Sequence, residues 1–242
     1  MSDSASSSVD EAAEVADAPS NGVAPPRGER TYGGLTAEQR RAKRRAQLIE
    51  AARELFGTKG FQSTTVRALV KESGLGERYF YESFADLEEL LIALLDEINS
   101  QVLAASLSAL GESEDYQARN VLGMTAWARA VTADPRNARV ILLESVGVSE
   151  RVERSRRRWL RRFAEVIVAY APSPPDGTIF SGPVIALGLV GAVHELTVEW
   201  YSGDIEMTLD EVILHAVVLF EGVRRLTENP PDDSESITRV PR

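Results

Sequence analysis

Apolar residues recur at every third or fourth position along most of this chain from residue 36 onward, which is the spacing of amphipathic α-helices. A first helix is predicted to begin at Thr36, because Gln39 stands three positions later and completes a capping box. We expect Gly57 and Gly60 to end this helix. Its predicted buried face consists of Leu48, Ala51, Ala52, Leu55 and Phe56.

Two shorter helices are predicted to follow. Ser63, Thr64 and Thr65 offer N-caps to a second helix, which ends at a turn over residues 73–74. A third helix is predicted from about residue 76 to residue 83. The apolar positions expected to bury this pair are Val66, Leu69, Val70, Phe80 and Phe84. Two short helices joined by a tight glycine turn are typical of a helix-turn-helix, whose second helix enters a DNA groove.

The helical pattern continues through the rest of the chain. A long helix over residues 86–110 begins with the capping box of Asp86 and Glu89. Further helices are predicted over 116–132, from 134 onward, and over 149–170, 178–201 and 208–227. No segment alternates as a strand does, so we expect an all-α fold of about nine helices. The longest apolar run, 184–193, has ten residues. A membrane span needs about 20, so no membrane association is expected.

The segment from Arg40 to Leu91 resembles the DNA-binding domain of the tetracycline-repressor (TetR) family. The matching residues are Ile49-Glu50-Ala51-Ala52, Leu55-Phe56, Gly60-Phe61, Thr64-Thr65-Val66, Gly74-Leu75, Phe80-Tyr81, Phe84, Glu88 and Leu90-Leu91. The resemblance implies a helix-turn-helix domain over residues 36–85 and a larger ligand-binding and dimerisation domain over 86–229. Residues 1–35 and 230–242 lack apolar periodicity, and we expect both segments to be disordered.

Several positions depart from the family pattern. Arg78 stands where Gly is common, Ser83 where His or Tyr is common, and Leu87 where a phosphate-binding Lys is common. Val70 and Gly76 replace a usual Ala and a usual Ser or Thr. None of these changes disrupts the buried frame, so we expect the fold to be retained with an altered base preference.

The resemblance also implies which residues contact DNA. Thr65 and Tyr81 would bind phosphates, while the third helix would present Arg78 and Glu77 to the major groove. Arg pairs bidentately with guanine and Glu accepts from cytosine, each pair giving about 1–3 kcal/mol of discrimination. Basic residues at the front of the first helix could reach phosphates or the minor groove, or form an ordinary solvated face. The expected DNA-binding set is Arg40, Arg41, Lys43, Arg44, Arg45, Thr64, Thr65, Arg67, Gly76, Glu77, Arg78, Tyr79 and Tyr81.

The charge distribution supports a localised DNA contact. The whole chain has a net charge of −10, which argues against a general polyanion binder. Residues 36–84 nevertheless carry ten basic and six acidic side chains, a net +4, whereas residues 1–35 carry −4 and residues 85–242 carry −10. One positive module on an acidic body would confine DNA to a single surface.

Aromatic and apolar stripes on the expected fifth and seventh helices allow two interpretations. Tyr116, Met124 and Trp127 lie on the fifth, and Trp159 and Phe163 lie on the seventh. They could be ordinary core. The resemblance implies instead a pocket inside the bundle that takes a small hydrophobic or amphipathic effector, and we expect these five residues to line it.

The last two expected helices allow two interpretations as well. The eighth is apolar nearly all round and carries small residues that would let another helix approach closely. Burial within one monomer would explain this pattern, but the resemblance implies a homodimer formed through these helices. Dimerisation would let two recognition helices meet two half-sites. The expected interface residues are Leu187, Gly191, His194, Val212, Ala216 and Phe220.

A run of arginines from Arg151 to Arg162 stands out on the expected seventh helix. It would be solvated and paired with acidic neighbours, or else bind an anionic ligand group or a second stretch of DNA.

Enzymatic motifs are absent from the sequence. His194-Glu195 is not followed by the second His of a zincin, and there is no nucleophile elbow, Walker loop or dinucleotide fingerprint. The chain has no cysteine and no secretion signal at its start, so we expect a cytoplasmic protein without metal or cofactor. The sequence therefore predicts a regulator, with repression favoured, that binds a palindromic operator and is released by an effector. The alternative is a ligand-binding or scaffold protein of the same fold that has lost operator binding.

Overall fold

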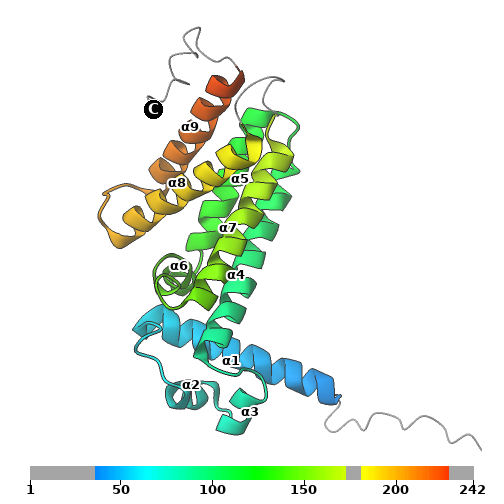
Figure 1. The fold of residues 1–242 in the computed structure, drawn as a ribbon, viewed down its shortest axis with the longest axis vertical. Helices are drawn as coiled ribbons and strands as arrows, with labels where there is room; N and C mark the ends of the chain where they lie inside the picture. Colours follow the sequence, from blue (N-terminus) through cyan, green and yellow to red (C-terminus); the bar gives the residue numbers. More distant parts are fainter. Residues whose placement is uncertain (1–35, 173–180, 229–242) are drawn as a thin grey trace, which may run out of the picture.

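A computed structural model describes residues 36–172 and 181–228, and in these ranges the chain forms nine α-helices, one short π-helix and no strand. Three helices form a small unit at one end, which we call the head (α1–α3). The remaining helices form an elongated bundle, in which α4, α5 and α7 run side by side while α8 and α9 lie along one flank (Figure 1). The segments predicted to be disordered, 1–35 and 230–242, lie outside the described residues.

The head contains α1 (Ala37–Lys59), α2 (Val66–Ser73) and α3 (Glu77–Tyr81). Thr36 and Gln39 form the predicted capping box, because each side chain accepts from the other residue's backbone N–H, at 3.1 and 2.8 Å. Thr65 caps α2 by accepting from the Ala68 N–H, and Gly74 ends α2 in the left-handed conformation with φ of 67°. These local caps confirm the predicted helix-turn-helix.

The bundle begins with α4 (Leu87–Leu110), which is capped by Asp86. It continues with α5 (Tyr116–Thr132), α6 (Pro135–Arg139) and the π-helix η1 (Val140–Glu144), which the sequence did not predict. It is completed by α7 (Glu150–Tyr170), α8 (Gly182–Ser202) and α9 (Leu209–Glu228). The predicted beginning of the eighth helix at residue 178 falls outside the described residues.

One apolar core joins the head to the bundle. Phe56, Leu69 and Phe80 have no exposed surface, so α1, α2 and α3 all converge on the same point. The cluster continues without a break along α4 and reaches Leu142 of η1 and Val152 of α7. The head therefore packs as an extension of the bundle core.

Ionic contacts surround this junction. Arg53 of α1 is 6% exposed and pairs with Glu50 on its own helix, Glu97 on α4 and Asn137 on α6. Arg136 of α6 pairs with Glu50 and Glu54 on α1. A buried guanidinium needs such partners to offset the loss of water.

Gly57 lies inside α1, so the prediction that it ends the helix was wrong. A Cβ atom at this position would lie 2.4 Å from the Cβ and 2.7 Å from the Cα of Arg136. The glycine is present because α6 crosses α1 at this point with no room for a side chain.

We expect Gly57→Ala to lower the free energy of unfolding by about 1–3 kcal/mol, because the added methyl group must separate two backbones. Urea denaturation measures this change. Gly123→Ala on α5 is the matched control, since its Cβ would meet only the flexible end of Leu110. Equal effects of the two substitutions would contradict the proposed close approach.

Candidate DNA-recognition surface and effector pocket

The short helix α3 is held by one face and exposed on the other. Phe80 is fully buried beneath it, and Phe84 is 2% exposed just after it. Glu77, Arg78 and Tyr81 are exposed, and the Arg78 side chain is 86% accessible. The residues of α3 predicted to face the major groove thus do not pack into the core.

Arginines from the front of α1 lie against α3. The Arg44 guanidinium stacks over the Tyr79 ring, 4.5 Å from its centroid, and the Arg45 guanidinium lies 4.8 Å from the centroid of Phe84. Such stacking orients a guanidinium without neutralising it. Arg41 and Lys43 are exposed on the same stretch, whereas Arg40 is partly buried and has an interaction of its own.

Glu82 is a residue of this surface that sequence reasoning missed. Its carboxylate accepts from Arg78 Nε at 2.8 Å and lies 3.9 Å from Arg44. The four-residue spacing from Arg78 was the available signal.

Two predicted DNA contacts have structural roles. Thr64 is 6% exposed and donates its hydroxyl to the carbonyl of Gly60 at 2.8 Å, so it stabilises the loop before α2 and was wrongly assigned to DNA. Gly76 is the N-cap of α3 and offers no side-chain hydrogen bond. Thr65 and Arg67 remain exposed, so their assignment stays a prediction.

An elongated pocket of about 130 Å³ lies inside the bundle. All five predicted ligand-binding residues, Tyr116, Met124, Trp127, Trp159 and Phe163, line it. On α4 its wall extends from Leu95 to Leu110, and fifteen helical steps correspond to about 22 Å. The pocket thus follows the long axis of the bundle.

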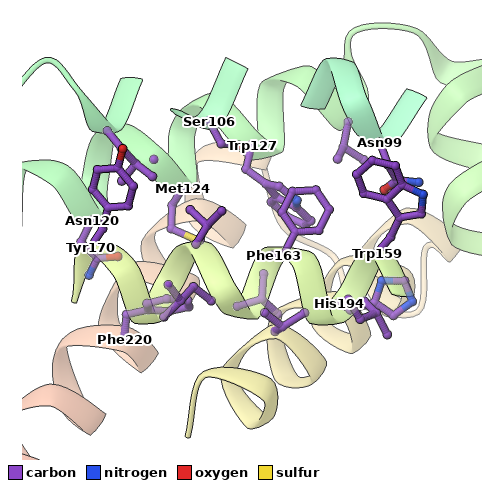
Figure 2. A pocket seen from close by; sticks show the side chains of 18 of the residues that line it. Asn99, Ser106, Asn120, Met124, Trp127, Trp159, Phe163, Tyr170, His194 and Phe220 are labelled. Carbon is purple, nitrogen blue, oxygen red and sulfur yellow. The ribbon is translucent and has the colours of Figure 1, made fainter. Parts of the chain in front are cut away.

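Polar side chains gather at the two ends of this pocket. Figure 2 shows Asn99, Trp159 and His194 at one end and Asn120 and Tyr170 at the other, with Ser106 and the apolar Met124, Trp127 and Phe163 between them. The Asn99 amide donates to the Leu95 carbonyl at 2.8 Å, which leaves its own oxygen available. Asn99, Asn120 and His194 were not predicted as ligand-binding residues, because isolated polar residues on helices carry no distinctive spacing.

His194 lies in the pocket wall beside an ion pair. Arg156 Nη1 is 3.4 Å from its Nε2 atom, and Arg156 also pairs with Glu153 at 2.9 and 3.0 Å. Burial lowers the pKa of His194 below its ordinary 6.5, and the positive charge of Arg156 acts in the same direction. Hydrogen bonding from Arg156 and then Arg157 lowers the pKa of Glu153 to about 2, so Glu153 keeps its charge and balances Arg156.

The predicted dimer-interface residues separate into two groups. Leu187 is 47% exposed and Gly191 is also on the surface of α8. Val212, Ala216 and Phe220 are between 2% and 6% exposed and pack inside the protomer, so their assignment to an interface was wrong. His194 is partly exposed and lines the pocket, so its assignment to an interface stays a prediction.

The faces of α8 and α9 that point away from the bundle also carry apolar residues. Six of these residues are each at least 40% exposed: Val184, Leu187, Leu214, Val218, Leu219 and Leu226.

Two helices, α4 and α8, are also long and apolar enough to span a membrane by length and composition alone. Half of the apolar window of α4 is buried inside the bundle, but only 17% of that of α8. Exposed apolar surfaces of this kind are typical of protein–protein or membrane contacts.

Comparison with known proteins identifies a family that the head resembles. The family described as bacterial regulatory proteins of the tetR family matches residues 48–94, which extend from α1 into α4. Residues 48–94 are therefore assigned to the TetR family. The head is a helix-turn-helix DNA-binding domain of the kind found in these transcriptional regulators.

Relatives of this chain include two uncharacterized HTH-type transcriptional regulators. One, from Haemophilus influenzae, is 23% identical over 160 residues, which cover 66% of this chain and 78% of the relative. The other, YfiR from Bacillus subtilis, is 31% identical over 80 residues, which cover 33% of this chain and 37% of YfiR.

Solved structures share the fold along most of the chain. The fatty acid degradation regulator FadR from Bacillus halodurans superimposes with a TM-score of 0.64 at 18% identity, covering 75% of this chain and 96% of FadR. FadR from Bacillus subtilis in complex with stearoyl-CoA gives 0.63 at 17% identity, covering 73% and 98%. At this identity the similarity establishes the fold alone.

Most of the arginine run on α7 is paired with acidic side chains, as the first of its two interpretations predicted. Arg151 pairs with Asp86 and Glu88, and Arg158 pairs with Asp96. The remaining pairs are Arg154 with Glu150, Arg156 and Arg157 with Glu153, and Arg162 with Glu165.

The partly buried imidazole of His194 should make stability depend on pH. The unfolded chain binds the His194 proton near its ordinary pKa of 6.5, and the folded protein binds it only at lower pH. The unfolded state therefore holds more protons in this window, so the free energy of unfolding decreases as pH falls from about 6.5 to the folded pKa.

We expect His194→Gln to remove the part of the decrease in the free energy of unfolding that comes from protonation of this histidine. Urea midpoints measured from about pH 8 to about pH 5 for the wild type and the variant give the difference. Parallel curves for the two proteins would show that His194 does not lose its proton on folding.

Proposed function

We propose that this protein is a homodimeric repressor that occupies a palindromic operator and leaves it when a small apolar or amphipathic effector enters the pocket. The observation that carries the proposal is the shared core: Leu95 belongs to the apolar cluster that supports the head and also lines the pocket. A ligand that alters this wall acts on the same close-packed side chains that hold α1–α3. The protein would act in the cytoplasm, where its DNA target is.

The chemistry of α3 supports sequence-specific binding. Arg78 carries an exposed guanidinium whose Nε is engaged by Glu82, so its terminal nitrogens stay available for a guanine edge. Arg41 and Lys43 of α1 would add phosphate contacts that depend on salt but not on sequence.

The pocket supports an elongated effector that is apolar in its middle and polar at one or both ends. Met124, Trp127 and Phe163 form the middle, and Asn99 and Asn120 offer hydrogen bonds at the ends. Arg156 at one end is balanced by Glu153, which favours a neutral polar group there over a carboxylate. The complexes of Bacillus subtilis FadR with stearoyl-CoA and of the multidrug binding protein EbrR with imidazole support ligand binding by related folds.

The exposed faces of α8 and α9 support a dimer with a second copy of this chain. Apolar Leu187 and Val218 lie on these faces, and a Cβ added at Gly188, Gly191 or Gly222 would meet nothing within 4 Å. The small residues leave room for close approach of partner helices, as in a four-helix bundle.

A scaffold protein that has lost operator binding is the second candidate. It is favoured by Glu77 and Glu82, which place negative charge on the recognition surface. Leu87, which replaces the common lysine, packs against the core instead of facing DNA. Measured DNA binding separates the two candidates.

Duplexes selected in vitro with the wild-type protein should share a palindromic site. We expect Arg78→Ala to raise the Kd for this site by about tenfold or more while leaving binding to random DNA unchanged, because a base contact is lost. Lys43→Ala should weaken binding to all duplexes alike and lower the salt slope by about 1. Fluorescence anisotropy with salt titration measures both.

The matched control for this prediction is Arg154→Ala, which removes an exposed arginine of α7 that pairs with Glu150. Arg154→Ala should change neither the Kd for the selected site nor the salt slope. Failure of the wild type to select any sequence would favour the scaffold candidate.

Dimerisation should depend on the exposed face of α9. Val218→Glu places a charge within the proposed interface, so we expect the protein to sediment as a monomer and to lose its preference for a two-fold site. Val121→Glu on α5, where the native valine is 48% exposed, is the control and should leave the dimer intact. A Val218→Glu variant that sediments like the wild type would place the interface elsewhere.

A further inference from the structure

The pocket wall and the head meet at the π-helix η1. Ile141 of η1 and its capping residue Ser145 line the pocket. Ser145 is fully buried, and its hydroxyl donates to the Ile141 carbonyl at 2.9 Å. Short π-helices are rare and occur frequently at functional sites, because they disturb the regular hydrogen bonding of a helix.

Glu144 lies in the same turn and contacts the head. One carboxylate oxygen accepts from the backbone N–H of Phe61 at 2.7 Å, and the other accepts from Arg139 Nε at 2.9 Å. Arg139 in turn donates to the carbonyl of Thr58 at the end of α1, at 3.2 Å. The Glu144 side chain is 15% exposed, so these charge-assisted bonds are shielded from water.

The loop that Glu144 holds determines how α2 begins. Gly60 has φ of 90°, and a Cβ there would lie 3.0 Å from the Glu144 carboxylate, so only glycine fits. The Gly60 carbonyl accepts from the Thr64 hydroxyl, and Thr64 N–H donates to the Phe61 carbonyl at 3.0 Å. A shift of the Phe61 amide therefore reaches the N-terminus of α2.

Other polar contacts between the head and the bundle do not include the pocket wall. Arg53 meets Asn137, and Arg136 meets Glu54, but neither Asn137 nor Arg136 is among the described residues that line the pocket. Arg151 of α7 pairs with Asp86 and is likewise absent from the lining. Arg53 also meets Glu97 on α4, which is two positions from the pocket-lining Leu95 and Asn99. Among the described residues, Glu144 is the polar contact to the head that is adjacent in sequence to a pocket-lining residue, Ser145.

We propose that Glu144 is a positioning residue that transmits the state of the pocket to the head, in addition to the covalent connection along α4. An occupant that presses on Ile141 and Ser145 displaces η1, and the Glu144 carboxylate carries that displacement to the loop between α1 and α2. The proposal rests on the effector-responsive function proposed above.

A double-mutant cycle on operator affinity tests the proposal without a known effector. Ile141→Trp places a larger side chain in the pocket wall, so the indole takes up pocket volume as a ligand would. We expect it to raise the operator Kd by about fivefold or more in the wild-type background and by less than about twofold in the Glu144→Ala background. Anisotropy with the in vitro selected duplex measures all four proteins. Ile141→Phe is a smaller substitution for use if the tryptophan variant does not fold.

Two matched controls distinguish transmission from general destabilisation. Glu144→Gln keeps an acceptor for the Phe61 amide, so the effect of Ile141→Trp should persist in it. Glu54→Gln alters another carboxylate contact between head and bundle, the one to Arg136, and should leave the effect of Ile141→Trp unchanged.

Equal effects of Ile141→Trp with and without Glu144 would overturn the proposal, and so would a normal operator affinity of the Ile141→Trp protein. Either result leaves the proposed function intact, because operator binding is still measured. Failure of the wild type to select any operator would instead overturn the proposed function, and this inference with it.

Discussion

A single close-packed core holds the head of this protein in place, and the rest of the arrangement depends on it. Leu90 and Leu94 of α4 close the space beneath α1, while Ile98 and Val102 continue the same cluster into the bundle, each no more than 2% exposed. Side chains packed to crystal-like density cannot move independently of their neighbours. The position of α3, which carries the side chains proposed to contact DNA, is therefore connected physically to the wall of a pocket in the bundle.

The ion pairs of Arg136 at the junction determine orientation more than stability. Surface ion pairs typically contribute about 0–1 kcal/mol, and most partners of Arg136 are partly hydrated. Their geometry is nevertheless specific, because Gly57 lets α6 lie directly on α1 and Gly60 lets Glu144 reach the Phe61 amide. Apolar burial keeps the head attached, and these contacts fix where α1 and the following loop lie against α6 and η1.

Helix boundaries in this chain could be predicted from sequence because their signals are local. Thr36 with Gln39, Asp86 and Asp134 each cap a helix within a few residues, and the structure contains all three caps. The aromatic stripes of α5 and α7 also identified the pocket wall, since residues at helical spacing share a face.

Features that depend on long-range packing could not be predicted. Val212 and Val218 belong to the same apolar helix, and only its packing in the bundle shows that one is buried and the other exposed. In the sequence Gly57 looked like a helix stop. The structural requirement for glycine there is the close approach of Arg136, which is far away in sequence and so could not be recognised. The contact of Glu144 with Phe61 joins residues 83 positions apart, and no sequence pattern signals it.

The central claim is that filling the pocket releases the operator. The most direct test titrates N-phenyl-1-naphthylamine, a neutral apolar dye, into the complex of protein and selected duplex while dye fluorescence and DNA anisotropy are recorded together. We expect the two signals to change with a common midpoint, and Phe163→Ala in the apolar middle of the pocket to shift both. Dye that fills the pocket while the duplex stays bound with unchanged affinity would contradict the central claim.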